Sequence, residues 1–240
     1  MLEMKYFFLV IKMLSVISVF GQQPTVYLIP GQGSDYRLYN NLTIPYDTVH
    51  VQYFTPSEVD SMESFAHQLA KQIDTTSPYG IIGVSLGGML ASEMKEFLNP
   101  EFVIVVSSAK CREELPARYR FMEKVPVNQI FSSEFYKNGA LLAQPLVEPD
   151  RKLEEETFKS MLKHKDPDFL KRTAGIIINW NRKEAPEGIY HIHGNNDNTI
   201  PLRNVQADVV IEDGSHMMML TKGDTLSKII SGRIYEILGE

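Results

Sequence analysis

The sequence predicts an α/β protein, in which a mainly parallel sheet is flanked by helices and one helical segment is inserted. Short runs rich in β-branched residues alternate along the chain with segments of helical period, as in a parallel sheet covered on both faces. Residues 111–187 break this alternation, because they hold several helical patterns and no convincing strand. We therefore expect residues 22–110 and 188–240 to form the core and residues 111–187 to be a helical insertion.

The strands are expected at residues 26–29, 49–53, 80–84, 102–107, 189–193 and 207–211. Two amphipathic stripes predict helices on either side of them, over residues 61–73 and 226–237. Within the insertion, Asp166 is typical of an N-cap and Pro167 of a first helical position. An apolar stripe follows them: Phe169, Leu170, Ala174, Ile177 and Ile178. Such an insertion lies over the carboxyl ends of the strands, where it can act as a lid.

Length and composition suit a single globular domain with an insertion. The chain has 240 residues, 43% of them hydrophobic and 22% charged, and a formal net charge of −6. Its lysines and arginines are scattered without a basic stripe, so nucleic acid is not an expected partner. Cys111 is the only cysteine, which excludes an intrachain disulfide and a cysteine-based zinc cluster and leaves the redox compartment undetermined.

The N-terminal segment is different in character, since residues 6–20 are apolar apart from one lysine and the serines. Lys5 supplies a positive start, and the run ends at Gly21 in a small-residue pattern before Gln22. We therefore expect residues 1–21 to be a cleaved signal peptide. The mature protein would then be exported, to the periplasm or the medium, without stable membrane association. A membrane anchor and a packed N-terminal element of a cytoplasmic protein are the alternatives.

A serine between glycines follows the third predicted strand, in the stretch YGIIGVSLGGML at residues 79–90. Gly83 and Gly87 flank Ser85 with the spacing G-x-S-x-G of a nucleophile elbow. In that turn, the two positions must lack a Cβ so that strand and helix can approach each other. The turn exposes the serine hydroxyl and leaves the backbone N–H of Leu86 free to face an oxyanion. The alternative is a Gly-rich strand-to-helix turn without a catalytic role. Only partner residues elsewhere in the chain can distinguish the two.

Two candidate partners of the serine follow later strands. Asp197 lies in the loop after residues 189–193, and His216 lies in the loop after residues 207–211. A nucleophile, a base and an acid that orients the base make up a catalytic triad, and each of these residues stands at the end of its own strand. Asp213 is the alternative acid, but it precedes His216 on the same short loop.

The stretches GVSLGG, IHGNNDNTIP and DGSHMMML resemble those of the α/β-hydrolase superfamily. The resemblance extends from Thr25 to the C-terminus, and the insertion corresponds to the variable cap of the family. It implies that Ser85 is the nucleophile, Asp197 the acid and His216 the base, in the chain order that the family uses.

The resemblance also implies an oxyanion hole. One donor is the backbone N–H of Leu86, and the other comes by position from Gln32 in the loop IPGQGSDY. The chain departs from the family in two ways: Pro30-Gly31 stands where many relatives have histidine-glycine, and the two leading antiparallel strands are not evident.

These roles imply a serine hydrolase that cleaves a carboxylic ester of a small-molecule acyl substrate through an acyl-enzyme, without a cofactor. The machinery would also serve thioesters, lactones, amides or C–C bonds. An acyltransferase and a non-catalytic ligand-binding protein are the alternatives from other classes. No metal site is expected, because the remaining histidines have no cysteine or carboxylate at ligand spacing: His50, His67, His164, His191 and His193.

The residues that shape the substrate pocket are left open by the sequence. Apolar side chains follow the elbow and the base, and they can either line a pocket or pack in the core: Met89, Leu90, Met217, Met218, Met219 and Leu220. Aromatic residues of the insertion can face either the cavity or the sheet: Phe121, Phe131, Phe135, Tyr136 and Trp180.

Overall fold

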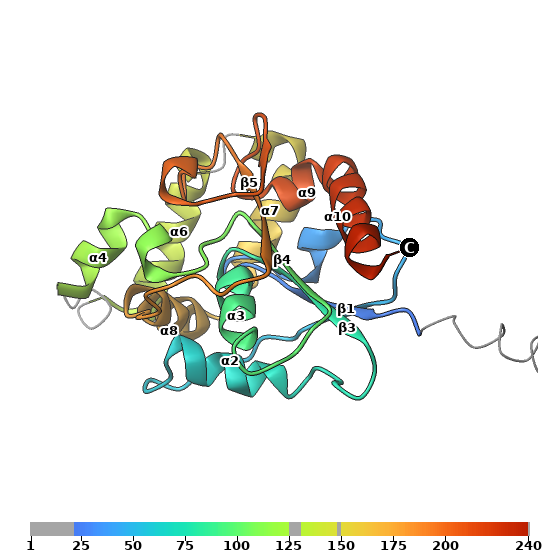
Figure 1. The fold of residues 1–240 in the computed structure, drawn as a ribbon. Coiled ribbons are helices and arrows are strands. Elements are labelled where there is room, and N and C mark those ends of the chain that lie inside the picture. The colour runs from blue at the N-terminus through green and yellow to red at the C-terminus, as the bar shows by residue number, and fades with distance from the viewer. Residues whose placement is uncertain (1–21, 125–130, 148–149, 240) are drawn as a thin grey trace, which may run out of the picture.

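The computed structural model describes residues 22–124, 131–147 and 150–239, and its strands form one six-stranded sheet (Figure 1). The strands are Thr25–Ile29 (β1), Thr48–His50 (β2), Tyr79–Val84 (β3), Phe102–Val106 (β4), Ile189–Gly194 (β5) and Val209–Ile211 (β6). Their order is β2-β1-β3-β4-β5-β6, and every neighbouring pair is parallel. The predicted α/β class is therefore confirmed.

The strand order reverses between β1 and β3, which lie side by side although β2 stands between them in the sequence. At such a switch point the loops that leave the two strands turn to opposite faces of the sheet and open a crevice at the carboxyl edge. The loop after β1 carries Gln32 and the turn after β3 carries Ser85. The topology thus places two of the predicted site residues at the crevice.

Helices cover both faces of the sheet. Met62–Ala70 (α2) and Leu86–Met94 (α3) lie on one face, and Gly223–Leu238 (α10) lies on the other with the short helix Met218–Thr221 (α9) (Figure 1). Successive side chains of β1 alternate between two buried clusters, Tyr27 and Ile29 in one and Val26 and Leu28 in the other. The sheet is therefore apolar on both faces, which explains why its strands read as continuous apolar runs.

The second strand is shorter than the sequence predicts and begins one residue earlier, at Thr48 instead of Val49. Val51 still donates its N–H to the Leu28 carbonyl at 3.0 Å, as an additional strand residue would. The next N–H, that of Gln52, turns to the side chain of Gln72 instead, at 2.9 Å. A side chain that competes for the backbone thus ends this edge strand.

The chain between β4 and β5 contains the insertion, whose described part holds Ala117–Lys124 (α4), Ser133–Val147 (α6), Glu155–Lys163 (α7) and Pro167–Ile178 (α8). No strand occurs in the described part of residues 111–187. Asp166 caps α8 by accepting the N–H of Asp168, and Pro167 opens the helix, as predicted. In Figure 1, α4, α6 and α8 lie on the left, away from the C-terminus, and α7 lies nearer the middle of the view.

The two ends of the insertion are joined to each other and to the core. Arg112 donates its backbone N–H to the Arg182 carbonyl at 2.8 Å. The Arg182 guanidinium makes two hydrogen bonds of 2.8 Å to Glu93 of α3, and the Trp180 indole donates to the same carboxylate at 2.6 Å. Since Glu93 is only 5% exposed, this carboxylate is a buried anchor that the two donors satisfy.

Residues 1–21, with the predicted signal peptide, lie outside the described residues. Within the described ones, no helix has both the length and the apolar character that crossing a bilayer requires.

Candidate active site

Ser85 lies on a strained turn between β3 and α3. Its φ of 53° and ψ of −119° are unusual for a residue with a side chain. The turn is held from both sides, because Ser85 donates its N–H to the Val106 carbonyl at 3.1 Å and its own carbonyl accepts the Ser108 hydroxyl at 2.7 Å. The end of β4 and the residues that follow it therefore fix the serine in its position.

The two glycines of the motif are required by close backbone approach. A Cβ at Gly83 would lie 2.3 Å from the Gly87 carbonyl oxygen, and one at Gly87 would lie 2.0 Å from the Ile29 carbonyl oxygen. Neither neighbour is a flexible side chain that could move away. The elbow therefore packs without space for any larger residue, which is the reason inferred from the sequence spacing.

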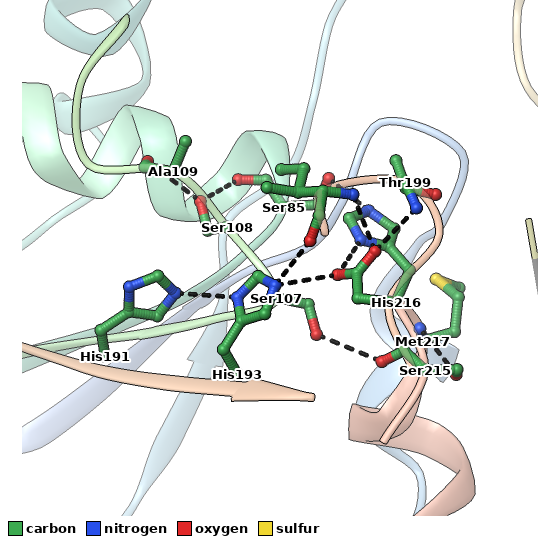
Figure 2. Close-up of polar contacts among 12 residues, drawn as sticks. Ser85, Ser107, Ser108, Ala109, His191, His193, Thr199, Ser215, His216 and Met217 are labelled. Carbon is green, nitrogen blue, oxygen red and sulfur yellow. Dashed lines mark hydrogen bonds and ion pairs between the residues drawn. The ribbon is translucent and has the colours of Figure 1, made fainter. Parts of the chain in front are cut away.

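A continuous hydrogen-bond path joins the three predicted catalytic side chains (Figure 2). His216 Nε2 lies 2.9 Å from Ser85 Oγ, and His216 Nδ1 lies 2.8 Å from Asp197 Oδ2. Asp197 and His216 are 3% and 6% exposed, so water competes little for these contacts. The arrangement has the geometry of a nucleophile, a base and an orienting acid.

Asp197 is held as an anion by its surroundings. Its Oδ1 accepts the backbone N–H groups of Thr199 and Ile200, both at 2.8 Å. Burial alone would raise the pKa of Asp197, but the imidazoles of His216 and His193 and the Ile200 N–H hold that pKa below its usual value. The other acid considered, Asp213, is exposed. Its backbone N–H donates a hydrogen bond to the side-chain oxygen of Asn195.

The predicted oxyanion donors adjoin the serine. In the part of the chain that the structure describes, the backbone N–H groups of Leu86 and Gln32 have no acceptor. The loop of Gln32 touches the elbow, since a Cβ at Gly31 would lie 3.4 Å from the Cβ of Ser85. The Gln32 side chain donates to the Leu170 carbonyl and the Thr173 hydroxyl of α8, each at 2.8 Å, which ties this loop to the insertion.

Ser85 and His216 line a cavity of about 430 Å³. The insertion supplies much of its wall: Arg118, Tyr119, Ala140, Ala143, Gln144, Phe158, Leu162, Leu170 and Ile177. A volume of this size suits a small organic molecule. The cavity is mostly apolar around the serine, so it favours a substrate with an apolar part next to the reacting group.

The residues that the sequence left open fall into two groups. Met89 and Met217 line the cavity, whereas Leu90, Met218, Met219 and Leu220 are buried in the core. None of the five aromatic residues named above from the insertion lines the cavity, and Trp180 instead bonds Glu93 in the core. No sequence motif singles out the insertion residues that do form the wall, which include Tyr119 and Phe158 as well as aliphatic side chains.

One contact to the acid was not assigned from the sequence. His193, on β5, is fully buried, and its Nε2 lies 3.3 Å from Asp197 Oδ2. The available signal was the pattern HIH, which places His191 and His193 on one face of the strand. Among the described residues, no group of histidine, cysteine and carboxylate side chains has the arrangement of a metal site.

Comparisons with known proteins support the fold. No family model and no curated protein matches the sequence. A thermophilic esterase from Thermogutta terrifontis is 15% identical, with a TM-score of 0.63 over 90% of this chain and 91% of that one. A hydrolase from Pseudomonas aeruginosa PA01 is 14% identical, with a TM-score of 0.64 over 92% of both chains.

An enol-lactonase from Burkholderia xenovorans LB400 is 13% identical, with a TM-score of 0.64 over 93% of this chain and 94% of that one. These likenesses cover nearly the whole of each chain, so they concern the complete fold and not one shared motif. The chain therefore has the α/β-hydrolase fold, that of the superfamily which its sequence motifs resemble.

Proposed function

We propose that the protein is a serine hydrolase that cleaves a small carboxylic ester through an acyl-enzyme. The observation that carries the proposal is the hydrogen-bond path from Asp197 through His216 to the hydroxyl of Ser85, at the wall of a cavity of about 430 Å³. The solved structures with this fold include proteins described as an esterase and as an enol-lactonase, which is consistent with chemistry at an ester carbonyl.

In the first half of the reaction, Ser85 Oγ attacks the carbonyl carbon of the ester while its proton passes to His216 Nε2. Asp197 holds the imidazole so that Nδ1–H points to its carboxylate and Nε2 is free to accept. The negative charge that develops on the carbonyl oxygen is stabilised by the N–H groups of Leu86 and Gln32. His216 then gives the proton to the departing alcohol, and an acyl-Ser85 ester remains.

In the second half, a water molecule gives a proton to His216 and attacks the acyl carbon, and His216 returns the proton to Ser85 Oγ as the acid leaves. Residues 111–187 serve in this proposal as the cap, which forms the wall of the cavity and limits the access of water.

Labelling with a fluorophosphonate tests the proposal. We expect the reagent to bind covalently at Ser85, as located by mass spectrometry of the peptide, and the protein to hydrolyse 4-nitrophenyl esters of short acids. Ser85→Ala should lose the label and at least about 10³-fold in kcat, with an unchanged unfolding temperature. Full hydrolysis by the folded Ser85→Ala protein would contradict the assignment.

A further inference from the structure

The catalytic dyad of base and acid continues into two further histidines on β5 (Figure 2). His193 Nε2 lies 2.7 Å from the Ile200 carbonyl and 3.3 Å from Asp197 Oδ2, the same oxygen that accepts from His216. His193 Nδ1 lies 3.0 Å from His191 Nε2. Both rings are fully buried, so these contacts are made without water.

The partners of His193 fix the direction of its hydrogen bonds. A carbonyl and a carboxylate can only accept, so the proton of His193 is on Nε2, and Nδ1 accepts the Nε2–H of His191. Both rings stay neutral, because burial lowers the pKa of His193 and lowers that of His191 to about 3. A directed chain therefore runs from His191 to His193 and on to the acid.

We propose that His193 is a positioning residue for Asp197, a role that rests on the proposed function of the triad. Its Nε2–H holds the Ile200 carbonyl, while the Ile200 N–H holds Asp197 Oδ1, so one side chain fastens the loop that carries the acid. The same N–H dipole faces Asp197 Oδ2 and draws negative charge away from His216. His193 thus sets both the place of the carboxylate and the strength with which it attracts a proton on the base.

His193→Phe removes the donor and keeps a buried ring, and His193→Gln keeps an N–H that can reach the acid. The groups around His193 that carry charge or titrate are Asp197, His216 and His191, with Lys110 beyond His191. In His193→Phe the Nε2–H dipole is lost, so Asp197 attracts the protonated imidazole of His216 more strongly. We expect the acid limb of the kcat/KM profile of His193→Phe to move to higher pH and its plateau to fall about tenfold, with most of both changes reversed in His193→Gln.

His191→Asn is the matched control, because it removes an equally buried ring that has no contact with the acid. It should lose stability but keep the pH profile. The titration of His216, followed by NMR, gives the same comparison without turnover, so failure of the esterase proposal leaves this test intact. A His193→Phe protein with the wild-type titration and the wild-type rate per folded molecule would overturn the positioning role.

A separate observation concerns the substrate. Gln144 of α6 lines the cavity of Ser85 and is only 9% exposed, yet its amide has no hydrogen-bond partner among the described residues. By contrast, the amide nitrogen of Gln32 in the same cavity donates to two acceptors of α8. Water can satisfy Gln144 while the cavity is empty, but a bound substrate displaces that water.

We infer that the substrate carries a polar, hydrogen-bonding group that meets Gln144, in addition to the scissile ester of the proposed function. An unbranched hydrocarbon chain would leave the amide buried without a partner, which disfavours binding. A hydroxyl or carbonyl at the right distance restores the bond. Sites that hydrogen-bond a substrate group reject the analogue that lacks it far more strongly than apolar pockets reject an extra methylene.

The test uses 4-nitrophenyl hexanoate and its monohydroxy derivatives, in which the hydroxyl is moved one carbon at a time along the chain, and a second series of esters with the hydroxyl in the alcohol part. We expect one position to raise kcat/KM about tenfold over the unsubstituted ester, and Gln144→Leu to remove that preference. Asn138→Leu, on the exposed side of the same helix, should leave it unchanged.

An equal effect of Gln144→Leu on every ester would overturn the inference, as would a wild-type protein that ranks the esters by size alone. A protein that cleaves none of them and takes no fluorophosphonate label would instead contradict the proposed hydrolase, so the two failures are distinguishable.

Discussion

At the scale of single residues, the site depends on positions where the backbone leaves no choice of side chain. Ser85 occupies a positive-φ conformation that costs on the order of 1–3 kcal/mol. The contacts from Val106 of β4 and from Ser108 beyond it offset this cost, and the serine hydroxyl is thereby directed at His216. A motif of five residues can predict this turn because its requirements are local.

Gly87→Ala should prevent stable folding of the elbow. The added Cβ would lie 2.0 Å from the Ile29 carbonyl oxygen, so β1 or α3 must move, and we expect the unfolding temperature and the esterase activity to fall together. Gly139→Ala is the control, since a Cβ there meets nothing within 4 Å, and the same substitution in the middle of α6 should stabilise the protein by about 1 kcal/mol. Equal behaviour of the two variants in thermal denaturation would contradict the steric argument.

Asp197→Asn should lower kcat by about 10⁴-fold while the protein stays folded, because an amide in place of the carboxylate favours the wrong tautomer of His216. Asp213→Asn changes an exposed carboxylate on the loop of His216 and should keep nearly full activity. Steady-state kinetics on one short ester compares the two. A larger loss in the Asp213 variant would move the role of the acid to that residue.

At the scale of elements, the core strands and their helices could be predicted, whereas the wall of the cavity could not. Strands such as Tyr79–Val84 are buried on both faces and are recognised from their apolar runs alone. Cavity residues such as Ala143 and Leu162 are ordinary helix residues, and which of them face the serine depends on how α6, α7 and α8 pack. Helical periodicity predicts an apolar face without saying what that face covers.

Ala143→Phe should narrow the cavity from the side of α6. We expect kcat/KM for a long ester to fall about tenfold more than kcat/KM for an acetate ester. The unchanged triad should still cleave any ester that is small enough to enter the narrowed cavity. Leu142→Phe changes the neighbouring residue, which is 80% exposed, and should leave the length preference as it is. The two variants are compared by kcat/KM on esters of increasing acyl length, and a parallel loss on all lengths would count against a cap that selects by size.

At the scale of the whole molecule, contacts between segments far apart in the sequence limit what can be predicted. Ser85, Asp197 and His216 could be predicted as candidate site residues because each follows a strand, but the contact of His193 with Asp197 depends on how the loop packs. The loop folds back through backbone bonds such as that of Ile200 to Asp197, which no sequence pattern reports. Long-range geometry of this kind is the part that the sequence does not predict.

Acidification should destabilise the protein well above the range where carboxylates titrate. The pKa of His191 is lowered from 6.5 to about 3 in the fold, mainly by burial, so below pH 6.5 the unfolded chain binds a proton that the folded chain does not. This histidine alone should lower the free energy of unfolding by about 2 kcal/mol between pH 7 and pH 5. His193 shifts in the same direction.

Urea denaturation at several pH values measures this change, and His191→Asn should show a shallower dependence than the wild-type protein. A free energy of unfolding that stays constant from pH 7 to pH 5 would contradict the neutral, buried state of both rings.

The link between Arg112 and Arg182 has a consequence for protein engineering. The chain leaves the core near Arg112 and returns to it near Arg182, and these two points are adjacent. The length of the segment between them therefore does not affect the pairing of β4 with β5. A short bridge could replace it, or the corresponding segment of another protein with this fold could be transplanted, as long as Glu93 keeps its two donors. New substrate ranges could then be sampled by exchanging one contiguous stretch of DNA while the triad and its sheet stay untouched.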